Sequence, residues 1–383
     1  MSDKLKVITI LGTRPEIIRL SRTMAALDKY TDHQIAHTGQ NYDYELNQIF
    51  FDDLEIRKPD HFMGVDTSSL GNVLGGTLIE SEKILRAEKP DAVVILGDTN
   101  SALAGIMARR LKIPLYHMEA GNRCFDLNVP EETNRRIIDH VSDFNLVYTE
   151  HARRHLLSEG ISHRRIYVTG SPMCEVLDHY KDKINASNAL DELGLTKQKY
   201  MLVSMHREEN VDYEKPLTDL VTALQNLAAK YDMPVIVSTH PRTQKRLDMF
   251  GLKLEDERVK FLKPFGFCDY NRLQKDAFCV ISDSGTISEE SSMLSFPAVT
   301  IRNALERPEA MDTGSITITG TNPDRISDCV AAVTDQFFSD NLAPVPVDYQ
   351  VTNTSQRVLQ LILGTAKLAH RWQGIEPFRK EES

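Results

Sequence analysis

The sequence predicts an α/β protein made of two Rossmann-like doubly wound domains that face one another across a cleft. Short apolar runs rich in β-branched residues alternate with longer amphipathic stretches, which is typical of parallel sheets covered by helices. Many of these runs end in turns of glycine and polar residues, as at Gly12-Thr13-Arg14-Pro15. The length of 383 residues is enough for roughly two domains.

The first series of elements predicts an N-terminal domain over residues 1–178. Its strands are expected, in chain order, at residues 5–11, 35–38, 92–96, 113–116, 145–148 and 166–169. Amphipathic patterns predict helices from about residue 14 to 30 and from 70 to 88. The last amphipathic stretch, 355–383, is expected to pack back onto this domain.

A second series predicts a C-terminal domain over residues 179–354. Its strands are expected at residues 201–204, 234–238, 259–262, 279–282 and 298–301. The polar stretch 180–199 lies between the two series and is interpreted as the linker. In this arrangement the ends of the strands in both sheets point into the cleft.

Composition excludes several classes of protein. A hydrophobic content of 41% and a charged content of 26% are ordinary for a globular chain, and a net charge of -10 argues against a general nucleic-acid binder. No apolar run is long enough to span a membrane and no signal peptide is recognised, so a cytoplasmic protein without membrane partners is expected. Five cysteines without Cys-x-x-Cys spacing predict neither a disulfide framework nor a zinc site.

Three carboxylates are candidates for acid and base catalysis. Asp98 and Glu119 follow neighbouring predicted strands, and Glu131 lies in Pro130-Glu131-Glu132, which is typical of a helix start. Carboxylates that share a half-buried cleft can have separated pKa values, so that one acts as acid and another as base. The alternatives are that Asp98 is only a helix N-cap and that the stretch around Glu119 is a solvated loop.

The turn Ser284-Gly285-Thr286 is a candidate phosphate site because it joins a predicted strand to a helix start, where backbone N–H groups are free. Glu290, one turn into that helix, could bind the hydroxyls of a ribose. A capped helix without a ligand is the alternative. Neither a Walker loop nor a G-x-G-x-x-G turn occurs, so no ATPase activity and no nicotinamide cofactor are predicted.

Basic side chains around these turns are candidates for binding a diphosphate, because arginine binds phosphate oxygens through paired donors. Most arginines are exposed and only aid solubility, but Arg14 and His206 directly follow predicted strands. The candidates are Arg14, Arg19, Arg123, His206, Arg207 and Arg307. His117, His240, His151 and His155 are interpreted as structural or exposed, and no metal is predicted.

Several motifs occur in a fixed order along the chain: Gly12-Thr-Arg-Pro-Glu16, Gly97-Asp-Thr99, Glu119-Ala-Gly121, Pro130-Glu-Glu132, His206-Arg-Glu-Glu-Asn210, Asp283-Ser-Gly285 with Glu289-Glu290, and Glu306-Arg-Pro-Glu309. Together they resemble the non-hydrolysing UDP-N-acetylglucosamine 2-epimerases over nearly the whole chain. The resemblance implies two Rossmann-like domains arranged as in GT-B glycosyltransferases, a UDP-sugar substrate and a homodimer.

The resemblance also implies roles for individual residues. Asp98, Glu119 and Glu131 match the family's acid and base carboxylates, and His206 matches the histidine near the diphosphate. Arg14, Arg19 (where the family usually has lysine) and Arg307 match residues of the ligand pocket. The remaining matches are the phosphate turn at Ser284, Gly285 and Thr286, the ribose carboxylate at Glu290, and the aromatic residue beside uracil at Tyr270.

Other positions resemble the branch that makes UDP-N-acetyl-L-fucosamine from UDP-2-acetamido-2,6-dideoxy-L-talose for capsule or O-antigen synthesis. These positions are Asn122, Cys124, Asp126, His240-Pro-Arg-Thr243, Phe267-Cys-Asp-Tyr270 and Ser284-Gly-Thr286. Gln40-Asn41 replaces the family's usual Gln-His. The family mechanism is elimination of UDP to a 2-acetamidoglycal, followed by its re-addition. The alternatives are a UDP-N-acetylglucosamine/UDP-N-acetylmannosamine 2-epimerase, a hydrolysing epimerase, a GT-B glycosyltransferase and an inactive nucleotide-sugar sensor.

Overall fold

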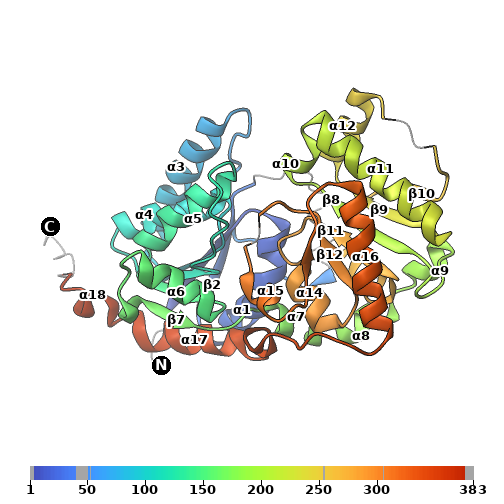
Figure 1. The fold of residues 1–383 in the computed structure, drawn as a ribbon. Coiled ribbons are helices and arrows are strands. Elements are labelled where there is room, and N and C mark those ends of the chain that lie inside the picture. The colour runs from blue at the N-terminus through green and yellow to red at the C-terminus, as the bar shows by residue number, and fades with distance from the viewer. Residues whose placement is uncertain (1–3, 40–50, 52, 253–254, 305, 376–383) are drawn as a thin grey trace, which may run out of the picture. The chain divides into compact units, whose positions relative to one another are not determined.

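The computed structural model describes residues 4–39, 51, 53–252, 255–304 and 306–375. The chain forms two compact units: unit 1 contains residues 1–178 and 351–383, and unit 2 contains residues 179–350. The sequence analysis placed these boundaries at 178/179 and 354/355. Each unit is a parallel sheet with helices on its faces (Figure 1), so the predicted fold class of two doubly wound α/β units is confirmed.

In the described part of unit 1, seven strands pair in the order β3-β2-β1-β4-β5-β6-β7, all parallel. The strands are β1 (Lys6–Leu11), β2 (Asp32–His37), β3 (His61–Phe62), β4 (Ala92–Leu96), β5 (Leu115–Met118), β6 (Phe144–Val147) and β7 (Ile166–Val168). The α-helices are α1 (Arg14–Tyr30), α3 (Leu70–Glu88), α4 (Ala104–Arg110), α5 (Pro130–Val141), α6 (Glu150–Ser158), α7 (Met173–His179, which crosses the unit boundary), α17 (Thr354–Thr365) and α18 (Ala369–Trp372).

The two faces of this sheet are covered by different helices. Ile8, Ile10, Val93 and Ile95 share one buried cluster with apolar side chains of α3, α4 and α5. On unit 1, α17 packs against α1, and Figure 1 shows this last long helix in red beside the N-terminal domain. The hydroxyl groups of Tyr116 and Thr365 are 2.7 Å apart, which joins the C-terminal segment to β5.

Unit 2 has six described strands in the order β10-β9-β8-β11-β12-β13, all parallel. The strands are β8 (Met201–Met205), β9 (Val235–Thr239), β10 (Val259–Leu262), β11 (Cys279–Ser282), β12 (Ala298–Thr300) and β13 (Thr317–Ile318). The α-helices are α8 (Lys181–Ala186), α9 (Ala189–Leu193), α10 (Glu208–Val211), α11 (Glu214–Tyr231), α12 (Pro241–Phe250), α13 (Phe267–Asp276), α14 (Ile287–Leu294), α15 (Pro308–Asp312) and α16 (Pro323–Phe338).

Alternate residues of the unit 2 strands enter two separate cores. Met201 and Val203 pack with α11, α12 and α16, whereas Leu202 and Val280 pack with α9, α13, α14 and α15. Both faces of each central strand are therefore buried, which explains why these strands read as continuous apolar runs in the sequence.

Several expected element bounds are wrong; for example, β2 begins at Asp32, three residues earlier than expected. Residues 180–199 are not a simple linker, because they contain α8 and α9, and Ser187 Oγ donates to Asp269 Oδ1 of α13 at 2.6 Å. The apolar residues Ile184, Ala189 and Leu190 are buried and hold this segment to unit 2. Strand β5 begins at Leu115, two residues later than expected, so Glu119 follows the strand directly.

Among the described residues, no helix has the length and apolar character needed to cross a membrane. All five cysteines are free thiols. The positions Gln40 and Asn41, which distinguish this chain from the family pattern, lie outside the described residues.

Candidate active site

Two predicted carboxylates meet at the carboxyl end of the unit 1 sheet. Strands β4 and β5 are parallel neighbours, and the Gly97 N–H donates to Met118 O at 2.9 Å, so Asp98 and Glu119 follow adjacent strand ends. A methyl group added at Gly97 would lie 3.9 Å from Glu119 Oε2. The Glu119 carboxylate therefore lies over the turn that carries Asp98, as the strand order predicted.

Glu119 is held in a constrained conformation. Its backbone φ is +64°, in the left-handed region that non-glycine residues rarely adopt and that costs on the order of 1 kcal/mol. Its carboxylate pairs with Arg19 of α1, and Asn122 Nδ2 donates to Glu119 Oε1 at 3.1 Å. Only 7% of Glu119 is exposed, so the ion pair with Arg19 is largely shielded from solvent.

Asp98 is held by an arginine of α5. Arg135 Nε donates to Asp98 Oδ2 at 3.0 Å, and Arg135 Nη1 lies 3.2 Å from Glu132. Burial raises the pKa of the Glu132 carboxyl, but the Cys124 N–H and the neighbouring guanidinium groups outweigh burial and lower it. Glu132 is therefore an ionised anchor for Arg135, whereas the predicted Glu131 lies half-buried in the first turn of the same helix.

The ion pairs around Asp98 continue into the interior of unit 1. Basic and acidic side chains alternate without interruption along a set of contacts. In order they are His117, Asp139, Arg123, Glu159, Arg136, Glu132, Arg135 and Asp98. The other nitrogen of His117, Nε2, is 2.8 Å from Gly97 O, so the set returns to the residue before Asp98. We call these eight side chains the charge ring.

The charge ring corrects one prediction. Arg123 was expected to bind substrate, but its side chain is fully buried. Its guanidinium donates to Glu159 Oε1 and Oε2 at 2.8 and 2.6 Å and to Asp139 Oδ2 at 2.7 Å. An arginine with two carboxylate partners in the interior has a structural role, and we remove Arg123 from the substrate-binding residues.

Glu16 joins two turns of the same edge. This buried carboxylate accepts the N–H groups of Gly12 and Thr13 at 3.0 and 2.7 Å and the Thr99 hydroxyl at 3.2 Å. Burial outweighs these donors and raises the pKa of the Glu16 carboxyl. The contacts fix the start of α1, and with it Arg14, next to the turn that follows β4.

In unit 2 the carboxyl end of the sheet is organised around Asp283. Its carboxylate accepts the backbone N–H groups of His206 and Arg207 at 2.9 and 3.0 Å and lies 2.9 Å from His206 Nδ1. Burial would raise the pKa of Asp283, but the charge of His206 and these donors lower it to about 2. The sequence analysis did not assign this role to Asp283, although an aspartate directly after a buried strand was a signal for it.

The predicted phosphate turn follows Asp283. The hydroxyl oxygens of Ser284 and Thr286 are 2.9 Å apart, and Arg307 Nη1 donates to Gly285 O. A methyl group on Gly285 would be 3.3 Å from Arg307 Nη1, so only glycine lets the guanidinium approach this closely without displacement. Arg307 Nε also lies 3.3 Å from the buried Glu289 carboxylate, which fixes its orientation.

Tyr270 and Glu290 lie together on α13 and α14. Gln274 Nε2 donates to Glu290 Oε2 at 2.7 Å. Burial, followed by the charge of Glu290, raises the pKa of the Tyr270 hydroxyl. The structure thus groups His206, Gly285 and Arg307 near Asp283, and Tyr270 with Glu290. His240 remains 6.5 Å from His206 between ring centres, on the next strand end.

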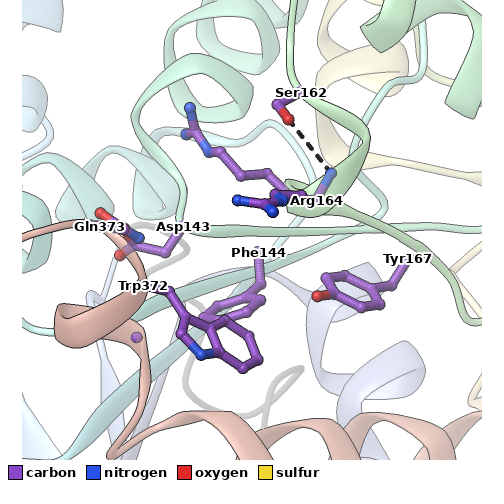
Figure 2. Close-up of a pocket in the computed structure, with 9 residues that line it drawn as sticks. Asp143, Phe144, Ser162, Arg164, Tyr167, Trp372 and Gln373 are labelled. Carbon is purple, nitrogen blue, oxygen red and sulfur yellow. Dashed lines mark hydrogen bonds between the residues drawn. The ribbon is translucent and has the colours of Figure 1, made fainter.

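A cavity of about 490 Å³ lies in unit 1 beside β6, β7 and α18. Figure 2 shows the rings of Phe144, Tyr167 and Trp372 on one side of it and Arg164 on the other. None of the predicted site residues lines this cavity. Among the described residues there is also no group of three or more histidine, cysteine or acidic side chains arranged to hold a metal ion.

Comparisons with known proteins show the family of this chain. Residues 25–363 match the family described as UDP-N-acetylglucosamine 2-epimerase. A UDP-N-acetylglucosamine 2-epimerase of Methanococcus maripaludis is 40% identical over 332 residues, which cover 85% of this chain and 90% of the relative.

Solved structures show the same fold. A structure of UDP-N-acetylglucosamine 2-epimerase from Rickettsia bellii has 46% sequence identity and a TM-score of 0.90, and the match covers 97% of this chain and all of the other (100%). The Methanocaldococcus jannaschii UDP-GlcNAc 2-epimerase in complex with UDP-GlcNAc and UDP has 34% identity and a TM-score of 0.88, covering 94% and 100% of the two chains.

Proposed function

The chain belongs to the UDP-N-acetylglucosamine 2-epimerase family and is an isomerase, and from that premise we propose that it inverts C2 of a UDP-2-acetamido sugar without hydrolysing it. The observation that carries this proposal is the Glu119 carboxylate, held over the Gly97–Asp98 turn in a left-handed backbone conformation. A carboxylate at an adjacent strand end supplies the second group that an inversion requires.

Removal of the C2 proton depends on departure of UDP, the leaving group at C1. The proton on C2 of a hexosamine is not next to a carbonyl group, so its removal by a base alone is difficult. When the bond between C1 and the UDP oxygen breaks, loss of the C2 proton forms a 2-acetamidoglycal and UDP. Re-addition of UDP to C1, with a proton delivered to the opposite face of C2, gives the epimer and balances every atom.

Unit 2 supplies the groups that suit the diphosphate. Arg307 is a cationic donor and His206 offers a ring nitrogen, and they are oriented by Glu289 and Asp283 respectively; the Ser284–Thr286 turn precedes α14. Such donors stabilise negative charge as it develops on a leaving diphosphate. Glu290 and Tyr270 are proposed to bind the ribose and the uracil ring, and Arg14 and Arg19 to complete the polar contacts of the substrate.

Unit 1 supplies the groups that suit the proton transfers. We assign these transfers to Asp98, Glu119 and Glu131 together, because an inversion needs proton donors and acceptors at both faces of C2. The pairing of Glu119 with Arg19 and of Asp98 with Arg135 keeps both carboxylates oriented between turnovers.

For the substrate we propose UDP-2-acetamido-2,6-dideoxy-L-talose, with UDP-N-acetyl-L-fucosamine as product for capsule or O-antigen synthesis. Asn122 contacts Glu119 directly, and Cys124 Sγ lies 3.4 Å from Glu132, so both of these positions that resemble the fucosamine branch lie against acidic side chains. The second candidate is UDP-N-acetylglucosamine, which the similar Methanocaldococcus jannaschii structure contains. A homodimer is proposed as the assembly, and light scattering of the purified chain tests it.

The proposal is tested by incubating the full chain with each of the two UDP-sugars and following the reaction by proton and phosphorus NMR. An epimerase converts the preferred sugar to its C2 epimer without accumulating UDP. We expect kcat/KM for the 6-deoxy-L-talose substrate to be at least about tenfold higher. Equal or higher kcat/KM for UDP-N-acetylglucosamine would transfer the assignment to that sugar, and stoichiometric release of UDP would refute a non-hydrolysing reaction.

A further inference from the structure

Asp139 is a buried carboxylate that lies outside the proposed proton-transfer residues. It belongs to α5 and has no exposed surface (0%). Each of its two oxygens is 3.2 Å from the Gly121 N–H, Oδ2 accepts Arg123 Nη1 at 2.7 Å, and Oδ1 lies 3.0 Å from His117 Nδ1. One side chain therefore contacts a residue of β5 and two residues of the loop that follows it.

The three partners of Asp139 flank Glu119 on both sides. His117 lies two residues before it in β5, and Gly121 and Arg123 lie in the loop after it. Glu119 and Gly121 both have positive φ, at +64° and +80°. A non-glycine residue stays in this region only when its surroundings fix the backbone, and the contacts of Asp139 supply that restraint.

The same contacts extend to Asp98. His117 bridges Asp139 to Gly97 O, at 3.0 and 2.8 Å from its two ring nitrogens. Gly97 directly precedes Asp98 and lies beneath the Glu119 carboxylate. The two strand ends that carry the proposed acid and base are therefore tied to one buried anion.

Asp139 has the charge that this role requires. Burial raises the pKa of its carboxyl, but the neighbouring His117 and Arg123 outweigh burial and lower it. Arg123 also pairs with Glu159. In the described structure, however, Glu159 contacts neither Gly121 nor His117. This difference provides a matched control.

We propose that Asp139 is a positioning residue for C2 epimerisation, and that it fixes the Glu119 loop against the Gly97–Asp98 turn through Gly121, His117 and Arg123. The inference rests on the proposed function, in which Asp98 and Glu119 transfer the C2 proton. A displacement of about 1 Å at a reacting group lowers a rate by about 100-fold, whereas groups that bind the nucleotide are unaffected.

The test compares Asp139→Asn with Glu159→Gln. Asparagine keeps the shape and one acceptor for Gly121 but loses the charge and directs an amide toward donors. We expect kcat to fall by about 100-fold in Asp139→Asn, with KM and UDP affinity close to those of the wild type. Each variant weakens one ion pair of Arg123, so we expect both to have a lower melting temperature than the wild type. In contrast to Asp139→Asn, Glu159→Gln should keep a kcat within about threefold of the wild type.

A crystal structure of Asp139→Asn supplies a readout that does not depend on activity. The proposal predicts a changed φ at Glu119 and loss of its contact with Arg19. If the variant does not fold, His117→Asn is used instead, because the shorter amide cannot bridge Gly97 and Asp139. An unchanged Glu119 loop, or a wild-type kcat in the variant, overturns the positioning role. A wild-type chain that does not epimerise any UDP-sugar overturns the proposed function instead, and the crystal structure then decides the positioning role alone.

Discussion

The strand ends of the two units carry opposite arrangements of charge. In unit 1 two of the proposed reacting carboxylates are each held by an arginine: Glu119 by Arg19 and Asp98 by Arg135. In unit 2 two of the proposed diphosphate-binding side chains are basic and are each held by a carboxylate: His206 by Asp283 and Arg307 by Glu289.

Under the proposed function, this difference explains how the same fold can serve proton transfer in one unit and diphosphate binding in the other. Carboxylates oriented by arginines can accept and return a proton while their position stays fixed. Basic side chains oriented by buried carboxylates present their remaining donors to an anion. The same βα architecture therefore suits proton transfer in one unit and diphosphate binding in the other, and function follows from the strand-end residues, as is general for such folds.

The largest expected effect comes from removing a carboxylate of unit 1. Glu119→Gln keeps the size of the side chain and a partner for Asn122 but cannot take a proton, so kcat should fall by about 1,000-fold. The rate of epimer formation measured by NMR checks this. Glu82→Gln on the surface of α3 is the control, since Glu82 pairs only with Arg86 in the described structure. Full activity of Glu119→Gln would show that Glu119 is not the acid or the base.

A smaller effect is expected in the charge ring. Arg123→Lys leaves Asp139 and Glu159 with a single shared point charge in place of a planar guanidinium, and should lower the free energy of unfolding by about 3 kcal/mol. Urea unfolding followed by circular dichroism measures it. UDP affinity by calorimetry should equal that of the wild type, since Arg123 has no exposed surface (0%). A large loss of UDP affinity at unchanged stability would restore Arg123 as a ligand-binding residue.

The smallest expected effect is the pH dependence of unit 2. The pKa of Asp283 lies at about 2, below its ordinary value of 3.8. The stabilisation from this carboxylate is fully present above about pH 4 and is lost as pH falls through about 2. This stabilisation of the folded state by the Asp283 carboxylate amounts to about 2 kcal/mol.

Unfolding of the wild type and of Asp283→Asn, measured at a series of pH values between about 5 and 2, isolates this contribution. The wild type should lose more stability than the variant across this range. Parallel curves for the two proteins would show that Asp283 does not stabilise unit 2 through its charge.

Much of the fold was predictable because buried parallel strands have an unmistakable composition. Strands β4, β10 and β11 and helix α3 have the predicted bounds, and the class of the sheet followed from the alternation. The two-residue strands β3 and β13 were not predicted, since so short a run carries no periodic signal. The helices at 181–193 were missed because their few apolar residues are separated by polar ones.

The residues at the strand ends of the candidate site could be predicted from the sequence, whereas the buried residues that hold them in place could not. Asp98 and Glu119 follow the ends of adjacent strands, as expected from the alternation of strands and helices. Arg123 was assigned wrongly because the sequence does not show which carboxylates an arginine in a loop will contact. Its partner Glu159 lies 36 residues later in the chain. Asp139 and Asp283 were missed as anchors for the same reason, since their roles depend on partners distant in the sequence.

The central claim is that C2 loses its proton and regains one from the other face while UDP is retained. The most direct measurement is turnover of the preferred UDP-sugar by the full chain in D2O, with C2 followed by NMR. We expect one deuterium at C2 of the product, no free sugar, and no such exchange in Glu119→Gln on the same timescale. Product that forms with its C2 proton intact would contradict it.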